Sequence, residues 1–571
     1  MSEGPGRIGF VLVAVVPEEG GGGEWRPLHA DGSPAGPAER VPDLAEAMAE
    51  RERRERPRWV LPSTGSSYPS LRRAGVRLDR CHDIELTEAL LLGHAGRWGE
   101  PRSLAAAWAR LTGARVPPDP TPRAAVPPGN NQAALFEPAP DTPTVDLAAL
   151  VGVYADQLTR IAATAEPGRF RLLVAAESAG ALIAVEMGAD GLPWSADVHD
   201  ALLVDLLGEP SPVGGPPRRL ADLAARIAQA FGVRQLHAES PAEVLRAFAR
   251  AGIELPNTRA WVLRGVDHPA VPLLLEYKEL YRIWTAHGWA WRDAWVRGGR
   301  FRPEYVPAGV VSGRWATRGG GALQIPKVVR RAVRADPGWR FVVADAGQLE
   351  PRVLAAVSGD ARLAAAGGAG DLYAALARDA FDGDRPRAKL ALLGAMYGQT
   401  GGSAIPALAV LRRSYPTAFG YVEAAARTGE AGGLVRSWLG RTCPPSSVGV
   451  GEDGEPVDVE TRPETDPFGP RARAAARSRG RFTRNFVIQA TAAEWALTLL
   501  AVLRGELAGT SAQLVFFQHD EVLVHCREEE AARVAEVVRA ASDRAGRLLF
   551  GDSPVRFPVD VSVVDCYADA E

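Results

Sequence analysis

Two short acidic motifs, far apart in this chain of 571 residues, carry residue types suited to metal-assisted chemistry. Asp345 follows the apolar run Val342–Ala344, and Asp520 comes shortly after the apolar run Val515–Phe517. Such runs are typical of buried strands, which deliver the next residues to a sheet edge or turn. Two carboxylates on neighbouring strands can hold two divalent ions about 3.5–4 Å apart, as in phosphoryl and nucleotidyl transfer. The alternative for each aspartate is an ordinary turn former or helix cap.

A third segment predicts a helix between Asp384, a candidate cap, and Gly398, a candidate end. Side chains four residues apart share one side of such a helix, and here they are Arg385, Lys389, Leu393 and Tyr397. The stripe would present two cations and an aromatic ring to one ligand. The alternative is an amphipathic surface helix whose basic residues face water.

Positive charge is concentrated beside both acidic motifs, although the formal net charge is only −3. The cations just before the first motif are Lys327, Arg330, Arg331, Arg334 and Arg340, and six arginines lie between positions 471 and 484. Taken alone, such runs are usually solvated helix faces. Their position beside two candidate metal ligands favours contact with phosphate groups instead.

Length and composition limit the class of protein. The chain exceeds the roughly 250–300 residues at which a single core stops growing, so two to four domains are expected. It is 46% hydrophobic and 24% charged, and we find neither an apolar stretch of about 20 residues nor an export signal. The four cysteines show no CxxC pairing, which argues against a structural zinc or a disulfide framework. We expect a cytoplasmic protein with reduced, buried cysteines.

Composition also divides the chain into parts. Residues 1–114 alternate strand-like runs such as Ile8–Val16 with helical ones such as Leu86–His94, and residues 115–145 form a proline-rich linker. From about 146 to 300 the pattern is mainly helical, with a helix start at Ser240. Residues 448–470 are acidic and rich in glycine and proline, and predict a flexible surface loop.

Together these motifs resemble those of the family A DNA polymerases, the bacterial DNA polymerase I class. Asp345–Arg352 resembles the first palm motif, Arg385–Gly398 the fingers helix, and Gln518–Glu521 the second palm carboxylate motif. Two further pieces fit: Ser312–Arg314 with Leu323–Pro326 resembles the entry to the palm, and Arg481–Glu494 the helix before the last motif. All five occur in the family's order, over roughly residues 170–571.

The resemblance implies template-directed DNA synthesis from dNTPs on a primer-template, with two Mg²⁺ ions, or Mn²⁺ in their place. Asp345 and Asp520 would hold the metals with help from Glu521, while Arg385 and Lys389 would grip the triphosphate. Lys389 would also protonate the leaving group. The other nucleotide contacts would come from Leu393, Tyr397, Gln348 and Glu350, with Glu350 beside the sugar 2′ position. The residues implied to line the DNA are Arg314, Arg481, Asn485, Gln489 and His519.

The chain departs from the family pattern at several of these positions. Ala346 and Gly347 replace an aromatic and a small hydroxyl residue, which affects packing beside Glu350. Leu393 replaces an aromatic residue; it can pack against a sugar but cannot stack, so we expect weaker nucleotide binding. Tyr373 stands where the family has a histidine that touches phosphate.

The N-terminal region resembles a 3′–5′ exonuclease domain around His82–Leu91. Exonuclease chemistry of this type needs a cluster of acidic metal ligands. The first strand has no Asp-x-Glu, and Ser67 and Tyr154 stand where further acids are expected. We therefore predict a degenerate exonuclease fold without proofreading, in which Asp83 and Glu85 are capping or surface acids.

The expected fold is thus α/β and α+β multidomain, with an exonuclease-like α/β domain followed by a right-hand polymerase of thumb, palm and fingers. The expected domains are exonuclease-like (1–114 and 146–165), palm entry and thumb (166–310), palm (311–366), fingers (367–485, with an inserted loop 448–470) and palm again (486–571). We expect a monomer that does not bind membranes, associates with the nucleoid and fills gaps in DNA repair. Two alternatives remain, a weakened polymerase scaffold that only binds nucleic acid and a metal-dependent nuclease.

Overall fold

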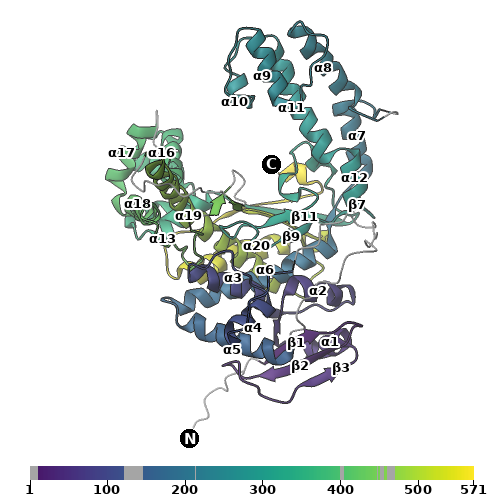
Figure 1. The fold of residues 1–571 in the computed structure, drawn as a ribbon, viewed down its shortest axis with the longest axis vertical. Helices are drawn as coiled ribbons and strands as arrows, with labels where there is room; N and C mark the ends of the chain where they lie inside the picture. Colours follow the sequence, from purple (N-terminus) through teal and green to yellow (C-terminus); the bar gives the residue numbers. More distant parts are fainter. Residues whose placement is uncertain are drawn as a thin grey trace.

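The computed structural model describes residues 11–120, 146–211, 214–368, 370–398, 404–445, 448–450, 456–458 and 470–570. An α/β unit lies at the N-terminal end, a second sheet that contains β11 lies in the middle, and two groups of helices rise on either side of that sheet (Figure 1). This is the α/β and α+β arrangement that the sequence predicts. Residues 1–10 and most of the predicted linker, 121–145, lie outside the described residues.

The N-terminal unit contains a five-stranded sheet in the order β3-β2-β1-β4-β5. Its strands are β1 (Leu12–Pro17), β2 (Gly23–Leu28), β3 (Glu39–Val41), β4 (Arg58–Leu61) and β5 (Arg80–Asp83), of which β1, β4 and β5 are parallel. Its helices are α1 (Leu44–Glu55), α2 (Thr64–Arg73), α3 (Ile84–His94), α4 (Leu104–Thr112) and α5 (Leu147–Ala162). The strand and helix predicted at Ile8–Val16 and Leu86–His94 correspond to β1 and α3.

Helix α6 (Pro167–Asp190) connects this unit to the centre of the molecule. Glu186 of α6 accepts hydrogen bonds from Tyr68 of α2 and from Arg504, both at 2.7 Å. Arg504 lies on the long helix α19 (Pro470–Glu506), which packs against α6. Glu186 thus joins the N-terminal unit, through Tyr68, to the central core, through its buried ion pair with Arg504.

A helical group follows, as the sequence predicts for residues 146–300. Its helices are α7 (Ala196–Leu207), α8 (Arg218–Ala230), α9 (Pro241–Arg250), α10 (Ala260–Leu263), α11 (Ala270–His287) and α12 (Trp289–Trp295). The predicted helix start is confirmed, because the Ser240 side chain accepts from the amide of Glu243. Short strands flank this group: β6 (Leu192–Pro193) precedes it, and β7 (Val296–Arg297), β8 (Arg300–Phe301), β9 (Glu304–Val306) and β10 (Ala316–Arg318) follow it.

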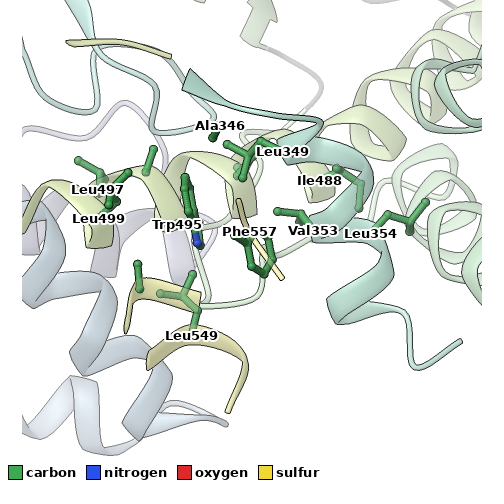
Figure 2. Packing of buried hydrophobic residues seen from close by; sticks show 14 of the residues in the cluster. Ala346, Leu349, Val353, Leu354, Ile488, Trp495, Leu497, Leu499, Leu549 and Phe557 are labelled. Carbon is green, nitrogen blue, oxygen red and sulfur yellow. The ribbon is translucent and has the colours of Figure 1, made fainter. Parts of the chain in front are cut away.

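The central sheet is antiparallel, in the order β14-β15-β11-β16. Its strands are β11 (Trp339–Ala346), β14 (Gln513–Gln518), β15 (Glu521–Arg527) and β16 (Val559–Val564). Helices α13 (Leu349–Val357), α19 and α20 (Ala531–Phe550) bury a large apolar cluster against it. Figure 2 shows Trp495 of α19 and Phe557 within this cluster, with Leu349 and Val353 of α13 close by. Burial of these side chains fixes the strand ends that carry the acidic motifs.

The second helical group consists of α14 (Ala361–Gly367), α15 (Leu372–Ala380), α16 (Arg385–Tyr397), α17 (Ala404–Ser414) and α18 (Pro416–Glu430). Helix α16 confirms the predicted one: the Asp384 side chain accepts from the amide of Arg387, and Gly398 ends the helix with φ 68°. The stretch 448–470 is not all loop as predicted, because β12 (Val448–Val450) pairs with β13 (Pro456–Asp458). The residues between and after these strands, up to 469, lie outside the described ranges.

Two helices are long and apolar enough to cross a bilayer by length and composition, contrary to our reading of the sequence. They are Pro167–Asp190 and Arg473–Glu506, and 67% and 83% of their apolar windows are buried inside the protein. Both pack in the central core, which accounts for their apolar character. All four cysteines are free and buried, as predicted.

Candidate active site

The two acidic motifs meet at one end of the central sheet. Asp345 lies near the end of β11, and Asp520 lies in the turn that joins β14 to β15. The amide of Ala346 donates a hydrogen bond of 3.1 Å to the carbonyl oxygen of Asp520. In the sheet register Asp345 pairs with Glu521 on one side and with Asp560 of β16 on the other. The prediction that neighbouring strands deliver the two aspartates is therefore confirmed.

The two carboxylates disfavour each other's charge. Burial and, after it, the nearby Asp345 carboxylate raise the pKa of Asp520 to about 6. Burial and the carboxylate of Asp560 likewise raise the pKa of Asp345. Bringing these groups together costs free energy, which a bound cation would offset.

The donor set fits magnesium. Mg²⁺ is commonly held by one or two carboxylates, while water and substrate phosphates supply its other ligands. Asp345 and Asp520 supply two carboxylates of this kind. Within the described ranges, no three Asp, Glu, His or Cys side chains are arranged to hold an ion by themselves.

A cavity of about 450 Å³ opens beside the aspartates. It is lined by Lys327, Arg330, Val343, Asp345, Gln518, His519, Asp520, Glu521, Asp560, Ser562 and Ala570. Part of the predicted basic run therefore faces the acidic pair, whereas Arg340 is occupied by ion pairs with Glu528 and Asp565. Lys327 and Arg330 thus line the same cavity as the two aspartates.

Glu521 is held by neighbouring side chains in this cavity. The Tyr567 hydroxyl donates to its carboxylate at 2.5 Å, and Arg330 forms an ion pair with it at 3.7 Å. The Arg330 guanidinium also lies 4.4 Å from the centre of the Tyr567 ring. The structure therefore fixes Glu521 beside Asp520, and Tyr567 is a positioning residue that the motifs did not reveal.

A second cavity, of about 320 Å³, also reaches Asp520. It is lined by Arg314, Gln348, Leu349, Glu350, Pro351, Leu393, Tyr397, Ala492, Ala493, His519 and Asp520. Four of the predicted nucleotide contacts and two of the predicted DNA contacts thus surround one space. Both cavities reach Asp520 and His519, whereas Asp345 lines only the first.

Glu350 organises one wall of the second cavity. Its carboxylate accepts a hydrogen bond from Arg314 at 2.7 Å and a short one from the Tyr397 hydroxyl. Tyr397 belongs to α16, whereas Glu350 belongs to the first turn of α13. This contact links the second helical group to the central sheet across the cavity.

Two site residues have left-handed backbone conformations that are uncommon outside glycine. Gln348 has φ 60° and His519 has φ 59°. Gln348 stands between β11 and α13, and His519 stands in the β14–β15 turn. Backbone of this kind persists when the surroundings hold it and is found at functional sites. Burial and the charge of Arg314 lower the pKa of His519.

Arg385 and Lys389 lie outside the linings of both cavities. The Arg385 Nε donates to Asp371 at 2.8 Å, and the Gln348 amide donates to the same carboxylate at 2.9 Å. The Tyr373 ring lies 5.6 Å from the Arg385 guanidinium and 6.0 Å from the Lys389 ammonium. The two cations thus share a surface next to the second cavity.

The three residues of α19 that are predicted to line the DNA differ in their exposure and contacts. Arg481 is exposed and packs against Gly398 at the end of α16, where an added Cβ would lie 3.1 Å from its side chain. Asn485 has a buried side-chain oxygen that bonds to nothing in the described part of the chain. Gln489 is half-buried. The structure places all three on the helix that also carries Ala492 and Ala493 of the second cavity.

Sequence reasoning missed Asp560 and Asp371. Asp560 could have been found from the alternation in β16, where Val559, Val561 and Val563 share one face and Asp560 shares the other with Ser562. Its register with Asp345 depends on strand pairing across more than 200 residues, which no local pattern shows. Asp371 looks like a helix cap, and its contact with Arg385 appears only in three dimensions.

The acids of the N-terminal unit have structural partners. Asp83 is buried, caps α3, and accepts from the amides of Leu86 and Thr64 at 2.8 and 2.7 Å. Burial raises its pKa to about 6. Glu85 pairs with Arg102 at 3.2 Å. The expectation that these are capping and surface acids is therefore confirmed.

Comparison with known proteins agrees with this geometry. A model of DNA polymerase family A matches residues 217–569, more than half of the chain. DNA polymerase I of Chloroflexus aurantiacus is 28% identical over 303 residues, which cover 48% of this chain and 30% of that protein. The thermostable DNA polymerase I of Thermus filiformis is 27% identical over 322 residues, covering 53% and 36%. The match thus spans about a third of the length of these curated relatives.

Among solved structures, the chain is similar to the POL domain of Pol1 from M. smegmatis, determined in complex with DNA primer-template and dNTP. The TM-score is 0.68 at 20% identity, and the match covers 98% of this chain and 96% of that one. At this identity the likeness concerns the fold. Because it covers nearly the whole chain, the shared fold includes the N-terminal α/β unit as well as the central sheet and both helical groups.

Proposed function

Because the chain belongs to DNA polymerase family A, we propose that it is a template-directed DNA polymerase that adds nucleotides from dNTPs to a primer 3′-hydroxyl. One observation carries the proposal: Asp345 and Asp520 meet at one sheet end, where Asp520 borders two cavities and Asp345 borders one of them. One cavity has Lys327 and Arg330 in its wall, and the other is lined by predicted nucleotide contacts. Phosphoryl chemistry at the aspartates would thus have binding surfaces on both sides.

In this proposal Asp345 and Asp520 hold the metal ions. When bound, Mg²⁺ or Mn²⁺ would activate the primer hydroxyl and stabilise the leaving pyrophosphate. Glu521, fixed by Tyr567 and Arg330, would assist near the second metal. The chain's own part is therefore to hold carboxylates ready in a fixed, partly buried geometry.

The nucleotide binds between α13 and α16 in this proposal. Glu350 and Gln348 would face its sugar, while Leu393 and Tyr397 would pack beside the sugar and base. Arg385 and Lys389 would bind the triphosphate, and Lys389 would donate the proton that the pyrophosphate takes up.

The primer-template would lie along the central sheet and α19. The residues we assign to it are Arg314, Arg481, Asn485, Gln489 and His519. Their donors suit phosphates and the minor-groove acceptors shared by all base pairs, so binding would not depend on sequence.

Single-nucleotide extension on a gapped duplex tests the proposal. Each dNTP and rNTP is supplied separately with Mg²⁺ or Mn²⁺, and the Asp345→Asn/Asp520→Asn double variant serves as the control. We expect template-matched extension that the double variant loses by at least about 100-fold, since charge stabilisation at the reacting phosphate is removed.

Other outcomes would assign another function. Salt-sensitive duplex binding without extension under either metal would favour a nucleic-acid-binding scaffold, for which the departures at Ala346, Gly347 and Leu393 speak. Shortening of the DNA that depends on Asp345 would favour the nuclease.

We also propose that the N-terminal unit is a degenerate exonuclease fold without proofreading activity. The support is that Asp83 is used as a helix cap and Glu85 as an ion-pair partner. An enzyme of this kind suits short gap filling in repair, as a monomer in the cytoplasm and at the nucleoid. The test compares removal of a 3′-mismatched primer nucleotide by wild type and by the Asp83→Asn/Glu85→Gln double variant. Removal by wild type that the double variant loses would overturn this proposal. The variant is a fair comparison because asparagine keeps the helix cap.

A further inference from the structure

Arg385, the first residue of α16, already has an anionic partner in the structure. Its Nε donates to one oxygen of Asp371 at 2.8 Å, and about half of each side chain is exposed. Lys389, one turn further along α16, forms no ion pair within the described residues and is exposed. Of the two cations on this stripe, one is therefore occupied by the protein itself and the other is not.

Asp371 is held in place by contacts that do not involve Arg385. Its other oxygen accepts from the Gln348 amide at 2.9 Å and, as the cap of α15, from the amide of Ala374 at 3.0 Å. Gln348 in turn accepts from the amide of Leu372 at 2.9 Å. The carboxylate thus stays where it is if Arg385 leaves.

The loop before Asp371 is fixed to the central sheet. Arg352 is only 1% exposed, and its guanidinium donates to the carbonyl oxygens of Gly347 at 3.0 Å and Gly370 at 2.5 Å. These glycines immediately precede Gln348 and Asp371. One buried arginine therefore holds both residues that meet at the Asp371 carboxylate.

We propose that Asp371 is a resident competitor for the triphosphate: its carboxylate occupies Arg385 until a nucleotide phosphate displaces it. The inference rests on the proposed function only in assigning a triphosphate to Arg385. Asp371 is accordingly a positioning residue that sets nucleotide affinity. A phosphate that binds the Nε edge of Arg385 must first break the pair, so the pair raises the Kd for every nucleotide alike.

The Asp371 carboxylate is charged at neutral pH. Burial pushes the pKa of Asp371 upward, but the hydrogen bonds from Arg385, Ala374 and Gln348 outweigh burial and lower the pKa to about 2. The competition therefore operates at any neutral pH and depends on charge and geometry.

Asp371→Asn is the informative substitution. Asparagine keeps an oxygen for Gln348 and for the cap of α15, and it replaces the oxygen that Arg385 uses with an amide. The matched control is Asp379→Asn, which removes a carboxylate from the same helix, where Asp379 pairs with Arg362 at 2.7 Å. If Asp371→Asn does not fold, Asp371→Ser replaces it, because serine also caps helices.

Binding of inorganic triphosphate to the full chain, measured by titration calorimetry without DNA or metal, provides the first readout. We expect Asp371→Asn to lower the Kd about two- to fivefold, the range set by an exposed ion pair. The control should leave the Kd unchanged. In an Arg385→Gln background, Asp371→Asn should have no effect, because the contact it releases is already gone.

Steady-state extension provides the second readout: Asp371→Asn should lower the KM for dNTP by the same factor and leave kcat within twofold. An unchanged or higher Kd for triphosphate in Asp371→Asn, or an effect that persists without Arg385, would overturn the inference. If no variant extends a primer, the proposed function fails, and the calorimetric result still decides the role of Asp371.

Discussion

The amide of Ala346 donates to the carbonyl oxygen of Asp520 at 3.1 Å, so one backbone hydrogen bond joins the chain segments that carry both acidic motifs. Asp345 and Asp520 are consequently held together before any cation binds. Burial and the neighbouring carboxylate raise the pKa of Asp520 to about 6. The candidate site is therefore an electrostatically unfavourable arrangement that the rest of the fold maintains.

A pH-dependent stability follows for the protein without metal. Between about pH 4 and 6 the folded state keeps a proton on Asp520 that the unfolded chain has released. The free energy of unfolding therefore falls as the pH rises through this window, by about 1–2 kcal/mol from this group after allowance for its partial exposure. Urea unfolding of wild type and Asp520→Asn at pH 4 and 7 measures the effect.

The comparison with Asp520→Asn is needed because burial also raises the pKa of Asp83 and Glu494, which add to the slope. The difference between the two proteins isolates Asp520. Saturating Mg²⁺ should remove most of that difference, because cation binding favours the charged carboxylate. An Asp520→Asn protein with the same pH slope as wild type would contradict the electrostatic account.

Discrimination between deoxy- and ribonucleotides should depend on Glu350. This side chain walls the second cavity and is held by Arg314 and Tyr397. We expect Glu350→Ala to lower the dNTP/rNTP ratio of kcat/KM by about tenfold or more, because one wall of the cavity is removed. Glu350→Gln keeps the bulk of the side chain and should change the ratio less. Equal ratios in wild type and Glu350→Ala would place the sugar elsewhere.

Nucleotide affinity should rise in Leu393→Phe. Leu393 lines the second cavity on α16, and a phenyl ring there can stack where leucine can only pack. Stacking on a base or sugar is worth about 1 kcal/mol or more, so the KM for dNTP should fall about fivefold. Leu390→Phe on the same helix is the matched control: Leu390 is 37% exposed and is not part of the cavity wall. Equal KM values for both variants would mean that Leu393 does not face the nucleotide.

Local sequence patterns predict the helices and strands whose ends are determined by neighbouring residues. The helices beginning after Ser240 and Asp384 have their N-terminal caps in the sequence itself, and the second also has its glycine end, Gly398. Asp345 and Asp520 were found because apolar, β-branched runs lead up to them. In both cases the information lies within a few residues of the feature.

Contacts between distant segments could not be predicted in the same way. Asp560 reaches Asp345 through strand register, and Asp371 reaches Arg385 between two helices. The pairing of β12 with β13 was hidden by a composition typical of loops. The apolar length of α6 was also missed, because charged residues such as Glu177 and Glu186 interrupt its sequence. Both are buried in ion pairs.

Arg352 should be the most sensitive single position for the shape of the site. Its buried guanidinium donates to the carbonyl oxygens of Gly347, Gly367, Gly370 and Arg556, at 3.0, 2.8, 2.5 and 3.0 Å. Arg352→Met leaves these acceptors without the donor, and we expect it to lower the free energy of unfolding by about 3–5 kcal/mol in urea. Arg362→Met, at an exposed arginine of the neighbouring α14, should change it by less than about 0.5 kcal/mol.

Arg352→Lys separates charge from geometry at the same position. A lysine keeps the positive charge, but its single ammonium cannot reach four carbonyl oxygens that the planar guanidinium spans. We therefore expect an intermediate loss of about 2 kcal/mol. Because Gly347 and Gly370 precede Gln348 and Asp371, the loosened turns should also lower kcat for primer extension in the protein that remains folded. A lysine variant with wild-type stability and kcat would show that charge alone, rather than the fork of hydrogen bonds, holds the two turns together.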